Sequence, residues 1–291
     1  MYHGTHERAY HGTFIQVYRG SFIHKLCVAL RKQRTKRSVE PLYRKNDMRL
    51  VYIYHSGFAI AAEGFSLLFD YFKDSDPDPV KGYVHTQLLQ REGPLYVLAS
   101  HFHPDHFNPA VLRWQEQKAD IHYLFSRDIL KHKRAKAEDA IYLRKGEQYV
   151  DERLRVTACG STDVGVSFLV ELNGLKIFHA GDLNNWHWEE ESTPQEIAQM
   201  EGDFKKALND LAKLAPQFDL AMFPVDPRIG GDYMRGARQF LDRIPTRCFV
   251  PMHFWAQPQK VAPFKSYAES KGTRFVLLGE PGEELEMRSE E

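Results

Sequence analysis

Cysteine is scarce in this chain of 291 residues, and that scarcity excludes two kinds of stabilisation. The three cysteines, Cys27, Cys159 and Cys248, are odd in number and lie far apart in the sequence. They therefore indicate neither a disulfide framework nor a Cys-x-x-Cys metal knuckle. A reducing compartment fits this composition best, and we expect a cytoplasmic location.

Long hydrophobic runs and net charge are absent too. Charged residues interrupt every apolar stretch well before the roughly 20 residues that a membrane-spanning helix needs. The 39 Lys and Arg residues balance 39 Asp and Glu residues, so the net charge favours neither nucleic acid nor an anionic membrane as partner. We expect a small-molecule substrate, no nucleic acid and no membrane, and we leave open whether the chain forms a homo-oligomer.

The neutral total hides an uneven distribution of charge. Residues 1–47 hold ten Lys or Arg against three Asp or Glu, a net charge of +7, which leaves 29 against 36, or −7, from Met48 onward. The acidic body disfavours a nuclease, because a nuclease needs a basic groove. We predict that residues 1–47 are a basic, poorly ordered N-terminal extension and that residues 48–291 form the folded domain.

Short apolar runs that begin at Met48 predict a strand-rich chain of the α/β class. The runs joined by Gly57 and Gly64 predict antiparallel strands, and Asn173-Gly174 predicts a two-residue hairpin turn. Thr193 to Glu196 has the pattern of a helix start. Two stacked sheets with helices on their outer faces fit this order. Further strands are expected at 95–100, 121–125, 140–144, 153–158, 219–224, 247–252 and 274–279, and further helices at 109–118, 233–241 and 261–271.

The strongest chemical signal is SHFHPDHF, residues 100–107, which directly follows a predicted strand. Imidazole nitrogens and carboxylate oxygens are good ligands for zinc and similar divalent ions. A loop at a strand end lets such side chains converge on one point, whereas several unpartnered buried imidazoles would be costly. The sequence therefore predicts a metal site built from His101, His103, Asp105 and His106.

The loop resembles the His-x-His-x-Asp-His motif of the metallo-β-lactamase superfamily, and all four motif residues match. HSGFAI with LLFD (55–60 and 67–70) is similar to the family's opening hairpins, KIFHAGD (176–182) to its strand before a bridging Asp, and VPMHF (250–254) to its last ligand. The resemblance implies a four-layer αβ/βα sandwich. It also implies that Asp182 bridges two metal sites, of which the first holds His101 and His103, and the second Asp105, His106 and His253.

One departure from the family concerns the first site, where the family usually supplies a third histidine just before the strand that begins near Val166. No histidine occurs between His132 and His179 in this chain. Asp163 is the nearest residue able to coordinate an ion, and it is either a ligand or the cap of a turn. We expect one or two divalent ions, with Zn²⁺ favoured and Mn²⁺ or Fe²⁺ left open by the oxygen ligands.

The expected reaction is hydrolysis of an ester, lactone, thioester or phosphoester bond of a small molecule by a metal-bound hydroxide. Asp105 or Asp182 would orient this nucleophile. The chain has no Gly-x-Ser-x-Gly elbow, phosphate-binding loop or dinucleotide glycines that would favour another mechanism. The similarity is greatest to sugar-phosphate lactonases and related hydrolases. A mononuclear iron thiol or persulfide oxygenase and a non-catalytic, metal-stabilised binding protein are the alternatives on this scaffold.

Other residues near these motifs carry weaker signals. His55 and Asp70 either hold a ligand in place or are ordinary polar residues. The run NNWHW at 184–188 forms either a substrate wall or part of the core. Asp226 and Arg228 either orient a polar substrate or belong to a solvated loop.

Overall fold

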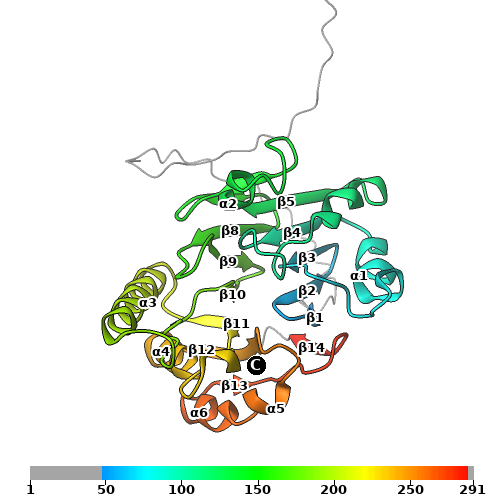
Figure 1. Cartoon of the computed structure of the whole chain (residues 1–291). Coiled ribbons are helices and arrows are strands. Elements are labelled where there is room, and N and C mark those ends of the chain that lie inside the picture. Colours follow the sequence, from blue (N-terminus) through cyan, green and yellow to red (C-terminus); the bar gives the residue numbers. More distant parts are fainter. Residues whose placement is uncertain (1–47, 288–291) are drawn as a thin grey trace, which may run out of the picture.

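The computed structural model describes residues 48–287, and these form two seven-stranded sheets that face each other (Figure 1). Residues 1–47, for which we predicted a poorly ordered extension, lie outside the described residues. The first sheet contains β1 (Met48–Tyr54), β2 (Gly57–Ala62), β3 (Phe65–Phe69), β4 (Leu95–Ala99), β5 (Ile121–Ser126), β6 (Ile141–Leu143) and β14 (Glu284–Met287). The second contains β7 (Gln148–Val150), β8 (Leu154–Cys159), β9 (Ser167–Leu172), β10 (Leu175–His179), β11 (Phe218–Pro224), β12 (Thr246–Met252) and β13 (Arg274–Phe275).

Both sheets change from antiparallel to parallel pairing along the chain. In the first sheet β1 to β3 pair antiparallel, as predicted, and β3 to β6 pair parallel. In the second sheet β7 to β10 pair antiparallel, and β10 to β13 pair parallel. The predicted hairpin between β9 and β10 is confirmed, with φ angles of 50° at Asn173 and 82° at Gly174. Such positive angles suit Asn and Gly.

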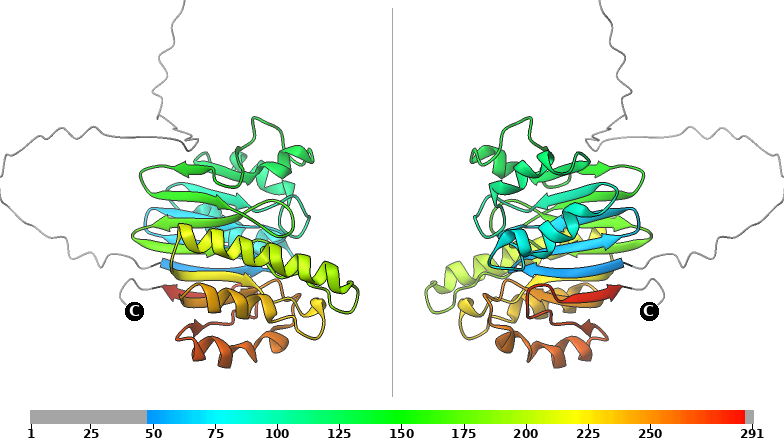
Figure 2. Two further views of the ribbon diagram at one scale, coloured as in Figure 1. Left: turned by 90° about the vertical axis from the view of Figure 1, so that its left-hand side faces the viewer. Right: turned by 90° about the vertical axis from the view of Figure 1, so that its right-hand side faces the viewer.

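Helices cover the outer faces of the sheets and complete the predicted four layers (Figures 1 and 2). The long helix α3 begins with the expected capping box between Thr193 and Glu196. It lies with α4 against the second sheet, where Phe204 and Phe240 are buried. The helices are α1 (Tyr83–Thr86), α2 (Arg127–Lys131), α3 (Pro194–Leu214), α4 (Arg235–Arg243), α5 (Pro258–Val261) and α6 (Phe264–Ser270), with 3₁₀ helices η1 (Pro79–Lys81), η2 (Leu88–Gln90), η3 (Pro109–Glu116) and η4 (Pro227–Ile229).

The main apolar core fills the space between the sheets and extends beneath α3 and α4. A second cluster lies between the first sheet and its outer helices and includes Val51, Tyr83 and Trp114. The first sheet thus has one apolar cluster on each face, which explains why β2, β3 and β4 are buried at every position. Within residues 48–287, no helix is both long and apolar enough to cross a bilayer.

Several local predictions need correction. The helix expected at 109–118 is the 3₁₀ helix η3. The helix expected at 261–271 is divided into α5 and α6 at Pro263, which has no backbone N–H to continue a helix. The strand expected at 274–279 contains only Arg274 and Phe275, which pair with Cys248 and Phe249 of β12. The short strands β7 and β14 were not predicted, since only pairing with β8 and β1 makes them strands.

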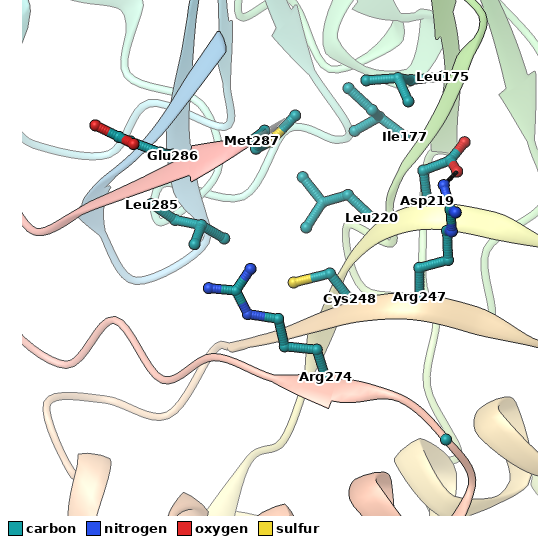
Figure 3. A pocket seen from close by; sticks show the side chains of 11 residues that line it. Leu175, Ile177, Asp219, Leu220, Arg247, Cys248, Arg274, Leu285, Glu286 and Met287 are labelled. Carbon is teal, nitrogen blue, oxygen red and sulfur yellow. Dashed lines mark hydrogen bonds and ion pairs between the residues drawn. The ribbon is translucent and has the colours of Figure 1, made fainter. Parts of the chain in front are cut away.

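A cavity of about 310 Å³ opens between the sheets at the edge where β10, β11 and β12 begin (Figure 3). Leu175, Leu220 and Leu285 form apolar walls there. Cys248 also lines the cavity, and burial raises the pKa of its thiol to about 11. The same strands end at the opposite edge of the sandwich, where the predicted metal site lies.

Candidate metal centre

The loop after β4 brings its histidines together by turning sharply. The backbone N–H groups of His106 and Phe107 both donate to the carbonyl of His103. The ring centroids of His101 and His106 are consequently 4.1 Å apart, and those of His101 and His103 are 4.7 Å apart. A loop of six residues thus gathers three imidazoles at the end of one strand.

Loops from both sheets complete two groups of four potential ligands. Within each group one ligand atom from each residue lies within 4.8 Å of the others. The first group consists of His101, His103, Asp163 and Asp182, and the second group of His55, Asp105, His106 and His253. All seven predicted ligands are therefore brought together, and His55 joins them.

Asp182 connects the two groups because each of its oxygens faces a different one. Its Oδ1 lies 3.2 Å from His106 Nε2 and 3.4 Å from His253 Nε2. Its Oδ2 lies 3.5 Å from His101 Nε2. Asp182 could therefore offer one oxygen to each group.

Two glycines allow the loops of the two sheets to approach this closely. Gly165 and Gly181 have φ angles of 74° and 52°. A Cβ atom at Gly165 would lie 2.1 Å from the Ser100 carbonyl oxygen, and one at Gly181 would lie 2.7 Å from the Ser100 side chain. Any larger residue would push Asp163 and Asp182 away from His101, because both glycines flank these carboxylates.

The partners of the ring nitrogens in three histidines indicate whether these residues fit a metal ion. Each Nδ1 has a polar neighbour: Ser100 Oγ lies 2.9 Å from His101, Asp70 Oδ2 lies 2.7 Å from His106, and Asp226 Oδ2 lies 2.9 Å from His253. Each Nε2, by contrast, is buried without a hydrogen-bond partner among the described residues. Such unpaired buried groups are costly, and a cation among them would remove the cost.

The distances between individual ligand atoms also fit metal coordination. Two ligand atoms about 2.0–2.2 Å from one ion are roughly 3.3–3.6 Å apart at a tetrahedral angle. His101 and His253 lie 3.5 and 3.4 Å from Asp182, and His103 Nδ1 lies 3.6 Å from Asp163 Oδ2. A divalent ion in each group therefore suits the residues present.

Two buried carboxylates hold the ligands of the second group in place. Asp70 accepts hydrogen bonds from the Ser100 backbone at 2.7 Å and hydroxyl at 2.6 Å, in addition to its contact with His106. Asp226 contacts His253 and the Arg228 guanidinium, whose Nε lies 2.9 Å from Oδ2. Burial opposes ionisation of Asp226, but His253 and Arg228 lower its pKa to about 2.

The electrostatics of both groups suit a bound cation. Burial, followed by the charge on Asp182, raises the pKa of Asp163. Burial also opposes ionisation of Asp182, yet His106 and His253 hold its pKa well below the usual range. Burial and the neighbouring His106 lower the pKa of His101 to about 3, so this imidazole is neutral and free to coordinate.

Partly exposed aromatic side chains surround the centre. The Trp186 indole N–H donates to the Asp182 carbonyl at 2.8 Å, and its ring lies 5.6 Å from that of His253. Trp188 stacks on Trp186 with centroids 6.0 Å apart. Trp255 lies 4.2 Å from the His55 ring, and the Arg228 guanidinium lies 4.5 Å above the Trp255 ring. These rings lie close to His55, His253 and the backbone of Asp182.

Comparison with known proteins places the fold in a family. Residues 49–199, more than half of the chain, match the model of a β-lactamase superfamily domain. This chain belongs to the metallo-β-lactamase superfamily. The predicted four-layer sandwich and the family resemblance are both confirmed.

Relatives of this superfamily chain include proteins described as UPF0173 metal-dependent hydrolases. The one from Natranaerobius thermophilus is 23% identical over 253 residues, which cover 82% of this chain and 100% of the relative. The one from Desulforamulus reducens is 24% identical over 265 residues, with the same coverage. The family match and these relatives together identify the chain as a metal-dependent hydrolase.

Solved structures agree with the superfamily fold. Igni18, a metallo hydrolase from Ignicoccus hospitalis, has a TM-score of 0.58 at 18% identity and covers 83% of this chain and 99% of its own. CmlA, a diiron β-hydroxylase from Streptomyces venezuelae, has a TM-score of 0.58 at 13% identity and covers 86% of this chain and 55% of its own. At these identities the likeness concerns the fold alone.

Three residues near this superfamily centre had only ambiguous signals in the sequence. Asp70 and Asp226 each contact a candidate ligand from a distant part of the chain, and nothing in their local sequence shows that contact. His55 begins the HSGFAI segment and belongs to the second group. Its signal was a histidine at a tight turn directly after a buried strand.

Proposed function

We propose that the chain hydrolyses an ester, lactone, thioester or phosphoester bond of a small molecule. The observation that carries this proposal is Asp182, whose two oxygens face two groups of buried, unpaired ligand atoms. Divalent ions held by these groups would supply Lewis acidity and lower the pKa of a water molecule so that it serves as nucleophile. We assign the ligand roles to His101, His103, Asp105, His106, Asp163, Asp182 and His253.

Asp105 and Asp182 are the proposed catalytic residues. Burial opposes ionisation of Asp105, but a contact with His55 and the charges of His106 and His253 hold its pKa below the usual range. Both carboxylates are therefore acceptors, and each can orient an attacking water by accepting its proton in a hydrogen bond. The Asp105 side chain is 21% exposed, so it can reach a nucleophile at the mouth of the centre.

The surroundings of the centre favour a small substrate with an apolar or planar part. Trp186, Trp188 and Trp255 lie near His253 or stack on a ring that does, and such rings would contact an apolar or planar part of a substrate. The net charge of −7 from Met48 onward disfavours a polyanionic substrate such as RNA. A lactone or a related cyclic ester fits this combination, in line with the sugar-phosphate lactonases that the motifs resemble.

The metal is proposed to be Zn²⁺, with Mn²⁺ and Fe²⁺ as the other candidates. Asp163 in place of an imidazole makes the first group richer in oxygen, which suits harder ions. This observation also supports a second candidate function, an iron-dependent oxygenase, and the fold is shared with a protein described as a diiron β-hydroxylase. The metal identity separates the two candidates.

A cytoplasmic location is proposed as well, on the evidence of cysteine. Cys159 and Cys248 are both free thiols, as a reducing compartment would keep them.

The proposal is tested by measuring metal content first and activity second. Elemental analysis of the purified protein should find up to two equivalents of a divalent ion, with zinc predominant. The loaded protein should then hydrolyse members of a panel of lactones, thioesters and phosphodiesters, and Asp182→Ala should not. Tight iron binding with oxygen consumption and no hydrolysis would favour the oxygenase instead. Metal binding with neither activity would favour a binding protein.

A further inference from the structure

We propose that His55 binds metal directly, as the third imidazole of the second group. His55 lies in the first sheet, in the turn between β1 and β2. It was not among the metal ligands predicted from the sequence. The inference rests on the proposed metal centre and extends it by one ligand. It also makes the two groups chemically unequal.

The backbone fixes His55 firmly at the centre. Its N–H donates to the Tyr52 hydroxyl at 2.9 Å, and its carbonyl accepts from the backbone N–H of His253 at 3.2 Å. The second of these bonds joins loops of the two sheets directly beside the candidate site. His55 also has a φ angle of 60°, so the turn is held in a conformation that side chains rarely adopt.

The His55 ring is buried among the other ligands and lacks an alternative partner. Its side chain is 0% exposed, and neither ring nitrogen has a hydrogen-bond partner within residues 48–287. Its centroid lies 4.1 Å from that of His253 and 5.7 Å from that of His106. A buried imidazole with both nitrogens unpaired is costly, and one bond to an ion would remove half of that cost.

The distance to Asp105 favours a shared ion over a hydrogen bond. His55 Nε2 lies 3.3 Å from Asp105 Oδ2. This is beyond the usual 2.7–3.2 Å of an N–H···O bond, whereas two ligands of one ion are roughly 3.3–3.6 Å apart. Asp105 in turn lies 3.8 Å from Nε2 of both His106 and His253. The four residues thus surround one position.

The added imidazole changes which ion each group prefers. Apart from Asp182, which both groups share, the second group then offers three imidazoles and one carboxylate, whereas the first offers two imidazoles and one carboxylate. Nitrogen-rich sites suit zinc and cobalt, and oxygen-rich sites suit harder ions such as manganese. The second group should therefore bind Co²⁺ or Zn²⁺ before the first.

Titration of the metal-free full chain with Co²⁺ tests this ligand role. Visible absorption reports the ligand field of each ion, and elemental analysis after desalting reports the number bound. In the unmodified chain, two ions should bind in resolved steps. In His55→Ala and His55→Gln the tighter step should weaken by about 100-fold or more, beyond the ~10–100-fold typical of a residue that only supports a ligand.

The two substitutions separate coordination from positioning. Gln keeps an N–H group that can reach Asp105 but offers no imidazole nitrogen. If Gln restores the tighter step while Ala does not, His55 only positions Asp105, and the inference is wrong. Added imidazole should restore binding in His55→Ala, since it can occupy the vacated space. His187→Gln is the matched control, because His187 is also buried with an unpaired Nε2 but belongs to neither group.

A measurement on the unmodified chain keeps the test valid if the variants fail to fold. With ¹¹³Cd²⁺ and ¹⁵N-labelled histidine, the His55 ring nitrogen should show coupling to cadmium. Absence of this coupling while His106 and His253 show it would overturn the inference. An unmodified chain that binds no metal at all would instead contradict the proposed function.

Discussion

The two ligand groups share one carboxylate but differ in their contact with solvent. In the second group, the side chains of His55, His106 and His253 are at most 2% exposed. In the first group, those of His103 and Asp163 are 38% and 39% exposed. The imidazoles of the second group are therefore more enclosed than the outer ligands of the first, and we expect the second group to retain its ion more tightly.

The largest effect is expected from removing the residue that both groups share. Asp182→Ala should remove at least one equivalent of metal and abolish hydrolysis, because each oxygen of Asp182 faces a different group. Elemental analysis and the substrate panel measure the two effects. Retention of both metal and activity would show that Asp182 is not a bridge.

Chelation should reveal the difference between the groups directly. An ion bound only by the folded chain stabilises it by about 2.7 kcal/mol when its free concentration is 100 times its dissociation constant. Increasing chelator should therefore lower Tm in two steps, with the exposed first group losing its ion before the second. Calorimetry with metal analysis at each chelator concentration provides the measurement. A single concerted step would mean that the groups do not differ in retention.

Asp226→Ala should weaken the second group selectively. Asp226 contacts Nδ1 of His253, and loss of such a partner typically costs ~10–100-fold in metal affinity. Competition titration should show this loss in the tighter step only. Asp232→Ala is a suitable control, since Asp232 also pairs with arginines, Arg235 and Arg238, without contacting a ligand. Equal weakening by both variants would indicate a general loss of structure.

Asp163→Ala should weaken the first group more than the second, because its Oδ2 lies 3.6 Å from His103 Nδ1. Asp163→His should keep or raise zinc affinity, since it would add a third imidazole to that group. The same competition titration measures both variants. Unchanged affinities in Asp163→Ala would identify the residue as a turn cap after all.

The smallest effect is expected from removing residues 1–47. All proposed ligands lie beyond Met48, so a chain starting there should fold and bind the same number of ions. Metal analysis and thermal unfolding of the shortened and full chains test this. If only the shortened chain is insoluble or free of metal, residues 1–47 contribute to the core or to the centre.

Local sequence signals predicted the features that depend on neighbouring residues. The hairpin at Asn173 and Gly174, the helix start at Thr193 and the ligand loop at 100–107 all fall in this class. The contact of Asp226 with His253 depends on the pairing of β11 with β12. That of His55 with Asp105 depends on the order of β2, β3 and β4 in the first sheet. Such contacts have no signature in the sequence near either residue, which is why the roles of Asp226 and His55 stayed open.

Several residues around the centre have a strained backbone conformation, and relieving that strain would stabilise the fold. His55, His253 and Trp255 have φ angles of 60°, 62° and 49°, and Asp70 has one of 43°. A non-glycine residue in such a conformation costs on the order of 1–2 kcal/mol. Glycine would adopt these φ angles at positions 55 and 253 without strain, but it has no imidazole to bind a metal ion. At these two positions, selection for stability of the metal-free fold would therefore oppose selection for metal binding.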